Sequence, residues 1–413
     1  MLTLLLAIAA LSILIACINH RFIGFQPMIF VLLVSLVFTS ILKLLAPYNA
    51  FISEFLENIL KLDFHYILLE CMIGFLLFSG GLNVDLKQLK KDKVIIALLS
   101  IGSTSISMVI IACLVFYGQQ LFNLPQMSFL LCLMLGAILS PTDPVSVIAN
   151  LKQIKAPKSI QTIISGEAIF NDGFGLLFFV ILYQLNFSNV DTCLSFIEVM
   201  KLFTLQSVGS VLVGFMLAHT LRKIITAIKG DDHMPVLVTV LGVALGIMTA
   251  KIFNLSVLLL LGTCSIFLSS SEGSHVISLK HKNQILFFWN IIDEVLNLFL
   301  FFLIGLEVVQ YDSSVSIILF SVFMIAVAII SRYLSVIIPV QLLSSNGKNN
   351  DMVKILVWGG LRGGLAIAMA LHIPVNEYSS IIVGSTYCVA IWTMLIQGST
   401  MNSVLKNSKL CVK

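Results

Sequence analysis

The chain has 413 residues, of which 59% are hydrophobic and 11% charged, and its formal net charge is +4. A soluble domain has roughly a quarter of its residues charged, so this composition leaves too few charges for a water-facing surface. It indicates an all-α protein that crosses the lipid bilayer many times. The basic residues are scattered among connecting segments, which argues against a nucleic-acid partner. The eight cysteines show no metal-ligand spacing and no nucleotide-binding loop occurs, so we expect no cofactor, no ATP-driven transport and no enzymatic activity.

Apolar segments separated by polar or Gly- and Pro-containing connections divide the chain, and each is close to the length of about 20 residues that spans a bilayer. The first has no basic start and no small-residue cleavage site, so we interpret it as a membrane span and not as a signal peptide. Thirteen transmembrane helices are predicted, at 2–18, 26–45, 64–83, 94–117, 126–150, 159–186, 195–221, 234–251, 255–270, 283–310, 314–341, 352–373 and 378–404.

The distribution of lysine and arginine orients these spans. If the N-terminus lies outside, the connections predicted to be cytoplasmic hold 18 of the 24 basic residues. Such an excess is what the positive-inside rule describes. We therefore expect a multi-pass protein, of a bacterial inner membrane, with its N-terminus outside and a short cytoplasmic C-terminus that carries no soluble regulatory domain.

Two parts of the chain resemble each other at an offset of 224 residues. Residues 70–84 and 294–308 share Glu, Phe, Leu, Phe, Gly, Leu and Val at matching positions. Seven predicted spans separate them, so they cross the membrane in opposite senses, which indicates an inverted-topology repeat. The same offset relates two interruptions, Ser-Pro-Thr-Asp-Pro at 140–144 and Gly-Gly-Leu-Arg-Gly-Gly at 359–364. Broken helices at matching positions of two repeats point to a substrate site, because non-helical backbone at this depth must line a cavity or be buried in protein.

The first interruption offers oxygen ligands. Pro141 and Pro144 lack the backbone N–H that would hold nearby carbonyls in a helix. The freed carbonyls, the hydroxyl of Thr142 and the carboxylate of Asp143 can bind a small cation, or Asp143 can simply cap the following half-helix.

The sixth span carries two carboxylates and an amide. Glu167 and Asn171 are four residues apart and share a helix face, and Asp172 lies about 100° further round. Because desolvation disfavours an ionised carboxylate, a buried Asp172 needs a proton or a cation, and competition between the two is what an exchanger requires. The alternative is an Asp172 that pairs with an arginine for stability.

Arg362 is the one cation in the second interruption, and it requires an anionic partner at this depth. We predict a structural ion pair between Glu167 and Arg362, which leaves Asp172 free to bind ions.

Other charged residues within the spans are expected to have partners or to face the ion path. Glu70 either faces the ion path or makes a structural contact. Asp293, Glu294 and Arg332 are expected to neutralise one another between the tenth and eleventh spans.

Three motifs in this order resemble a known family: Thr142-Asp143-Pro144, Gly166-Glu167 followed by Asn171-Asp172-Gly173, and Trp358-Gly-Gly-Leu-Arg362-Gly. Together they are similar to the sodium/proton antiporters of the first cation–proton antiporter group, the NhaP/NHE type, over essentially the whole chain. The resemblance implies that Asp172 binds the ion and the proton, with Asn171 beside it. Relatives with two adjacent Asp residues tend to be electrogenic, so the Asn-Asp pair implies electroneutral one-for-one exchange.

The resemblance also implies thirteen helices in two domains and an elevator-type movement. A dimer domain would comprise roughly 1–91 and 234–312 and hold a homodimer together. A core ion-transport domain would comprise roughly 92–186 and 313–405, and 187–233 would be a connecting helix.

One position departs from the family pattern. Many relatives have a serine directly after the motif glutamate, and its hydroxyl can bind the ion, whereas this chain has Ala168. Ser165 or Thr142 can supply an oxygen instead, so the preference among Na⁺, Li⁺ and K⁺ is open.

The expected function is exchange of Na⁺ or Li⁺ for protons, with a monovalent cation at Asp172, Asp143 and Thr142. A K⁺/H⁺ or calcium-tolerant exchanger is the nearest alternative, and a cation channel is a further one. An intramembrane aspartyl protease would also place two Asp residues on separate spans, but its Tyr-Asp and Gly-x-Gly-Asp signatures are missing near Asp143 and Asp172.

Overall fold

The computed structural model describes residues 2–60, 72–84, 86–143, 147–148, 151, 158–187, 196–228, 233–270, 277–307, 314–343 and 349–408. Within them the chain is helical, and the one pairing of extended backbone is an isolated antiparallel bridge between Asp143 and Leu361. Nine helices of this part of the chain are long and apolar enough to cross a membrane. The predicted class, a polytopic all-α membrane protein, is thereby confirmed.

In chain order the helices are α1 (Leu2–Ile18), α2 (Pro27–Leu45), α3 (Ala50–Leu60), α4 (Ile73–Leu82), α5 (Leu86–Lys91), α6 (Lys93–Ala97), α7 (Ser103–Gly118), α8 (Phe129–Leu139), α10 (Lys158–Phe187), α11 (Phe196–Ala227), α12 (Met234–Ile252), α13 (Val257–Ser269), α14 (Leu279–Glu307), α15 (Val315–Leu343), α16 (Asn349–Trp358), α17 (Gly364–Leu371), α18 (Ser379–Trp392) and α19 (Ser399–Lys406). Short π-helical segments, Leu98–Gly102 and Thr393–Gly398, join α6 to α7 and α18 to α19.

The number of thirteen spans stays a prediction. Three predicted spans coincide with apolar helices that are shorter than a full crossing, α4, α8 and α13. A fourth, 352–373, consists of the two helices α16 and α17. Helix α3 lies in a stretch that we expected to be a connection.

Local sequence signals start several of these helices. The Ser128 hydroxyl accepts the Leu131 N–H at the start of α8, and the Ser256 hydroxyl accepts the Leu259 N–H at the start of α13. Each serine satisfies one backbone donor that the first helical turn leaves without a partner. Pro27 and Pro235 occupy first-turn positions of α2 and α12, where no N–H is needed.

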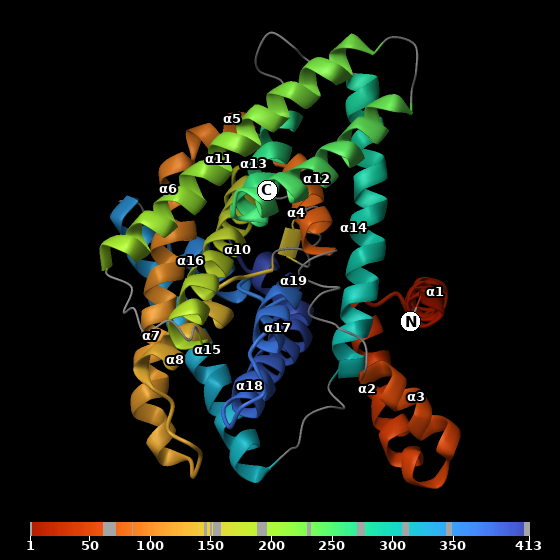
Figure 1. Ribbon diagram of the computed structural model, residues 1–413, viewed down its shortest axis with the longest axis vertical. Coiled ribbons are helices and arrows are strands. Elements are labelled where there is room, and N and C mark those ends of the chain that lie inside the picture. Colours follow the sequence, from red (N-terminus) through yellow and green to blue (C-terminus); the bar gives the residue numbers. More distant parts are fainter. Residues whose placement is uncertain are drawn as a thin grey trace.

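The helices pack as two groups that meet along α10 (Figure 1). In one group α14 contacts α1, α2, α4 and α12, and α13 contacts α4 and α11. In the other group α7 packs on α8 and α15, and α18 packs on α15 and α17. Helix α10 contacts α8 of the second group and α4 and α13 of the first, so it lies where the two groups adjoin.

Two interrupted helices cross within the second group. Helix α8 ends at Leu139 and is followed by non-helical backbone, and non-helical backbone also separates α16 from α17. The Asp143 N–H donates to the Leu361 carbonyl at 2.7 Å, so the two interruptions lie directly against each other. This contact confirms the predicted broken helices and brings them together.

The close approach at the crossing requires a glycine. A Cβ atom at Gly363 would lie 2.6 Å from both Cβ and Oδ2 of Asp143. Real Cβ atoms do not come that close to other heavy atoms, so a side chain at this position would separate the two interruptions.

We predict that Gly363→Ala destabilises the protein by about 1–3 kcal/mol, the usual cost of forcing an extra carbon into a packed core. The melting temperature of the detergent-solubilised protein, followed by fluorescence-detected gel filtration, measures this loss. Gly102→Ala is the matched control, because a Cβ atom there meets nothing within 4 Å. Equal melting temperatures of the two variants would contradict the assigned close packing.

Candidate functional site

A cavity of about 620 Å³ opens between the two helix groups at the crossing. On one side it is lined by α10 and the first interruption, and on the other by α4 and α14. Four of the predicted site residues lie on its wall: Asp172, Asp143, Thr142 and Ser165. Thr142 and Ser165 are buried, whereas Asp172 and Asp143 are partly exposed. The structure thus brings together residues from two separate sequence motifs.

Helix α10 faces the cavity with a polar stripe. Lys158, Gln161, Ser165 and Asp172 all line the cavity and recur three to seven residues apart, the spacing of one helix face. The stripe leads from the start of α10 to Asp172. It can therefore carry water, protons or hydrated cations along the helix to the carboxylate.

Helix α14 forms the opposite wall with a second polar stripe, and sequence reasoning missed it. Asn290, Asp293, Glu294 and Asn297 line the cavity. Their spacing of three and four residues within an otherwise apolar helix was the available signal. The expected mutual neutralisation of Asp293 and Glu294 with Arg332 is wrong, because these carboxylates face the cavity while Arg332 pairs elsewhere.

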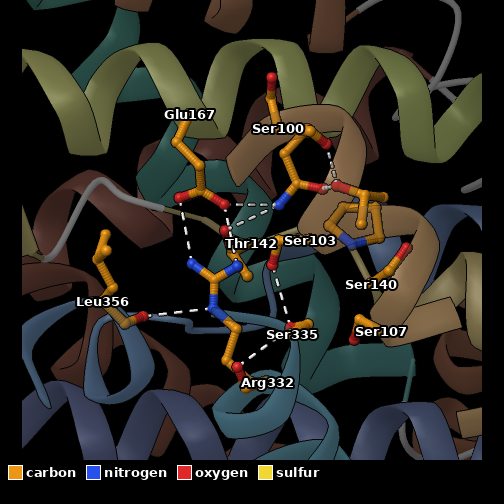
Figure 2. A network of polar contacts seen from close by, with 12 residues as sticks. Ser100, Ser103, Ser107, Ser140, Thr142, Glu167, Arg332, Ser335 and Leu356 are labelled. Atoms are coloured by element: carbon orange, nitrogen blue, oxygen red, sulfur yellow. Dashed lines mark hydrogen bonds and ion pairs between the residues drawn. The ribbon is translucent and has the colours of Figure 1, made fainter. Parts of the chain in front are cut away.

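The partner of Arg332 is Glu167, in a bidentate ion pair (Figure 2). Nη1 and Nη2 of Arg332 donate to Oε1 and Oε2 of Glu167 at 3.0 and 3.1 Å, and Nε donates to the Leu356 carbonyl at 3.3 Å. Both side chains are buried. Paired donors of this kind match the two carboxylate oxygens and strengthen the contact.

This pair corrects the predicted partnership of Glu167 with Arg362. Arg362 instead donates through Nη1 to the carbonyls of Ser140 and Pro141, at 2.7 and 2.9 Å. These carbonyls follow α8 and belong to the helix end that carries partial negative charge. They draw the Arg362 guanidinium away and leave Glu167 to the arginine of α15.

The two interruptions neutralise each other's helix ends. Arg362, from the second interruption, covers the C-terminal end of α8. Asp143, from the first, lies against Gly363, the residue that precedes α17. A negative charge near a helix start and a positive charge near a helix end are both favourable.

Asn171 holds this assembly together from behind the cavity wall. Its amide nitrogen donates to Glu167 Oε1 and to Thr142 Oγ1, both at 3.1 Å, and its oxygen accepts from Thr104 Oγ1 at 2.6 Å. The side chain is completely buried, and it is not among the residues that line the cavity. We therefore interpret Asn171 as a positioning residue for Thr142 and not as an ion ligand.

Two further positions complete the comparison with the sequence. Ala168 lines the cavity between Ser165 and Asp172, so the missing hydroxyl of the family pattern falls on the wall of the site. Glu70 lies outside the described residues.

A seam of serines joins α7 to α15 beside the ion pair. Ser103 Oγ donates to Ser335 Oγ at 3.0 Å (Figure 2). Ser107 Oγ donates to Ser331 Oγ at 3.4 Å. All four are buried. Small polar residues let helix backbones approach closely within a membrane, so the seam fixes α15, and with it Arg332, next to the site.

Comparison with known proteins shows the family of the chain. The family model described as the transmembrane sodium/hydrogen exchanger matches residues 6–407. The chain belongs to the sodium/hydrogen exchanger family. A relative from Pseudomonas aeruginosa, the Na⁺/H⁺ antiporter NhaP, is 32% identical over 98% of this chain and 96% of its own length. The antiporter ApNhaP of Aphanothece halophytica is 28% identical, and the match covers 82% of this chain and 64% of ApNhaP.

The fold of this exchanger-family chain also matches a solved structure. The sodium proton antiporter MjNhaP1 from Methanocaldococcus jannaschii superposes with a TM-score of 0.72 at 17% identity, covering all of this chain and 99% of that one. The resemblance drawn from the three sequence motifs is therefore confirmed.

We predict that Arg332→Gln destabilises the protein by about 3–5 kcal/mol, because it leaves the Glu167 carboxylate buried without its partner. The double variant Glu167→Gln/Arg332→Gln removes both charges and recovers much of the loss. Melting temperature and the monodisperse fraction in gel filtration measure both effects. A double variant no more stable than Arg332→Gln would show that the pair does not account for the loss.

Proposed function

We propose that this chain exchanges Na⁺, or Li⁺, for protons across the membrane, and that the two ions compete for Asp172. The observation that carries the proposal is the contrast between two carboxylates of α10. Glu167 is held by Arg332, whereas no hydrogen bond or ion pair to Asp172 occurs within the described residues. An unpaired carboxylate on a cavity wall needs a proton or a cation, and either one suffices.

The charges at the crossing support a one-for-one stoichiometry. Lys158 at the start of α10 and the α14 carboxylates on the opposite wall are not counted here. At the crossing itself, among the described residues, Asp143, Glu167 and Asp172 carry three negative charges, and Arg332 and Arg362 carry two positive ones. The empty site is therefore one charge negative. One proton or one monovalent cation makes it neutral, so both loaded forms carry the same charge and exchange is electroneutral.

The same balance couples the two ions. An uncompensated charge is costly in a low-dielectric interior, so movement of the empty site through the membrane is disfavoured relative to movement of either loaded form. Exchange then proceeds without a leak of either ion.

Alternating access is supported by the position of the cavity between the two helix groups. The core domain, roughly 92–186 and 313–405, supplies α10 and the first interruption. The dimer domain, roughly 1–91 and 234–312, supplies α4 and α14. An elevator-type movement of the core against the dimer domain would carry Asp172 from one side of the membrane to the other. We propose that 187–233 connects the two, and that two copies form a homodimer with the N-terminus outside, in a bacterial inner membrane.

An inverted repeat would give this movement its symmetry, and one hydrogen bond and one backbone register support it. Ser107 and Ser331, which are in contact, are separated by the repeat offset of 224 residues. Extending the antiparallel register of Asp143 and Leu361 by three residues pairs 140 with 364, the same offset. Residues related by a two-fold axis lie next to each other only where the axis passes. The Ser107–Ser331 contact and the bridge at Asp143 therefore both lie where such an axis is expected.

The cation is proposed to bind oxygens of Asp172, Asp143 and Thr142, with Ser165 within the same wall. Sodium is favoured over potassium because the relatives NhaP and ApNhaP are named Na⁺/H⁺ antiporters. No contact in the described part of the chain favours the potassium, calcium, channel or protease alternatives.

Asp172→Asn is expected to abolish exchange while the protein remains folded. An uncharged amide takes up no proton in this pH range and lacks the negative charge that attracts a cation, so the two ions no longer compete for it. Proteoliposomes with an internal pH dye measure the pH change on adding Na⁺, Li⁺ or K⁺. For the wild type we expect the apparent KM for Na⁺ to rise as the pH falls, since protons compete. Asp351→Asn is the matched control, because Asp351 contacts Lys354 at 3.8 Å on α16 and is not among the residues that line the cavity. Exchange by Asp172→Asn at the wild-type rate would overturn the assignment.

Electroneutral exchange predicts that the initial rate is independent of membrane potential. A potential of 100 mV acts on one moving charge with about 2.3 kcal/mol, which would change an electrogenic rate severalfold. The test measures the initial rate in proteoliposomes whose membrane potential is set by a K⁺ gradient and a K⁺ ionophore. The ionic balance outside is kept with a cation that the protein does not transport. A rate that follows the potential would contradict the one-for-one charge count without affecting the assignment of Asp172.

A further inference from the structure

Two adjoining pockets lie away from the ion cavity, where α4 and α13 end and α14 begins. Their volumes are about 320 and 410 Å³. They share five lining residues and so form one continuous depression: Leu82, Ser269, Ser270, Lys282 and Leu286. We refer to it as the α13–α14 site.

The two halves of the α13–α14 site differ in chemistry. The smaller pocket is mostly apolar, with side chains such as Leu268, Ile277 and Ile285 on its wall. The larger one is polar and adds Asn83 and Lys87. Among the described residues that line either pocket there are two lysines and no carboxylate. The described lining thus combines two ammonium groups with an apolar slot.

The C-terminal end of α13 uses only part of the donor capacity of this site. Its C-terminal carbonyls already have donors, since Arg222 Nη2 donates to the Phe267 carbonyl and Lys282 Nζ to that of Ser269, the latter at 2.7 Å. An ammonium group has three N–H donors. Lys282 thus keeps two for another acceptor while one holds α13.

The site opens at one end of a candidate membrane span, Leu279–Leu306. Leu279, the first residue of α14, lines the apolar pocket and is 80% exposed. Two turns further along, Phe287 is 70% exposed. Large apolar side chains exposed on a spanning helix face lipid, so the apolar slot begins beside the lipid and the lysines lie at its polar end.

From this arrangement we infer that the α13–α14 site binds an acidic glycerophospholipid. Its phosphate lies between Lys87 and Lys282, with the Ser269 and Ser270 hydroxyls beside it, and one acyl chain enters the apolar slot. The bound lipid joins the ends of α4, α13 and α14, which belong to the helix group that faces the moving core. This inference does not depend on the transported ion.

The test measures lipid retained by the full-length chain. Delipidated protein is mixed with phosphatidylglycerol or phosphatidylcholine of the same acyl chains, and bound lipid is counted by native mass spectrometry. The variant Lys87→Gln/Lys282→Gln is compared with Lys90→Gln/Lys280→Gln, which removes two exposed lysines a few residues away. We expect the wild type and the second variant to retain phosphatidylglycerol in preference to phosphatidylcholine. The first variant should lose about fivefold for each lysine, the weight of one basic side chain at an acidic membrane surface.

Three results would overturn the inference. Equal losses in the two double variants would indicate general surface charge. Equal retention of the two lipids would exclude recognition of an acidic headgroup. Displacement of phosphatidylglycerol by inorganic phosphate alone would indicate a phosphate site without a lipid. If the double variant does not fold, Lys87→Gln alone, at an exposed position of α5, tests the same contact against Lys90→Gln.

Discussion

Charge at the depth of the bilayer has to be balanced, and the crossing of the two interrupted helices is arranged around that requirement. Arg362 covers the end of α8, Asp143 lies at the start of α17, and Arg332 holds Glu167. Breaking two helices exposes backbone dipoles that would be costly in lipid, so these charges make the interruption tolerable. Once these charges are balanced against one another, the negative charge of Asp172 is the one left without a counter-charge. In the proposed mechanism the site binds a cation because these balanced charges leave one negative charge over.

The balance depends on distances that small side chains permit. Gly363 lets the two interruptions touch, and the serine seam lets α15 approach α7 closely enough to present Arg332. The π-helical segment Thr393–Gly398 contributes as well, because Thr393 Oγ1 accepts the Arg362 N–H at 3.1 Å. Such segments turn side chains out of the regular helical register and are frequent at functional sites. Larger residues at these positions would separate the charges, and the energy of each pair falls with separation.

Much of the site could be predicted from the sequence, because its elements are marked by local signals. Prolines and glycines mark both interruptions, and a carboxylate within an apolar span is conspicuous, so Asp172, Asp143 and Thr142 could be assigned to one cavity. The partner of Glu167 could not be predicted. Two arginines lie within apolar spans, and the choice between them depends on the rotation of α15 and on the carbonyls that attract Arg362. The polar face of α14 was missed for a related reason: Asp293 and Glu294 were matched with Arg332, the arginine of the next predicted span, whereas packing turns the two carboxylates toward the cavity.

Net charge and ligand geometry have different effects at this site, and Ala168 illustrates the difference. The attraction of a monovalent cation to the crossing comes from the surplus negative charge, which the residue at position 168 does not alter. A hydroxyl there would add one dipole to the coordination of the ion and would favour cations whose size suits the added oxygen. In the proposed mechanism its absence acts on the preference among Na⁺, Li⁺ and K⁺, while the exchange of one cation for one proton rests on the five ionised side chains at the crossing. Stoichiometry then depends on the charges at the crossing and selectivity on the oxygens of the cavity wall, so a substitution can change one without the other.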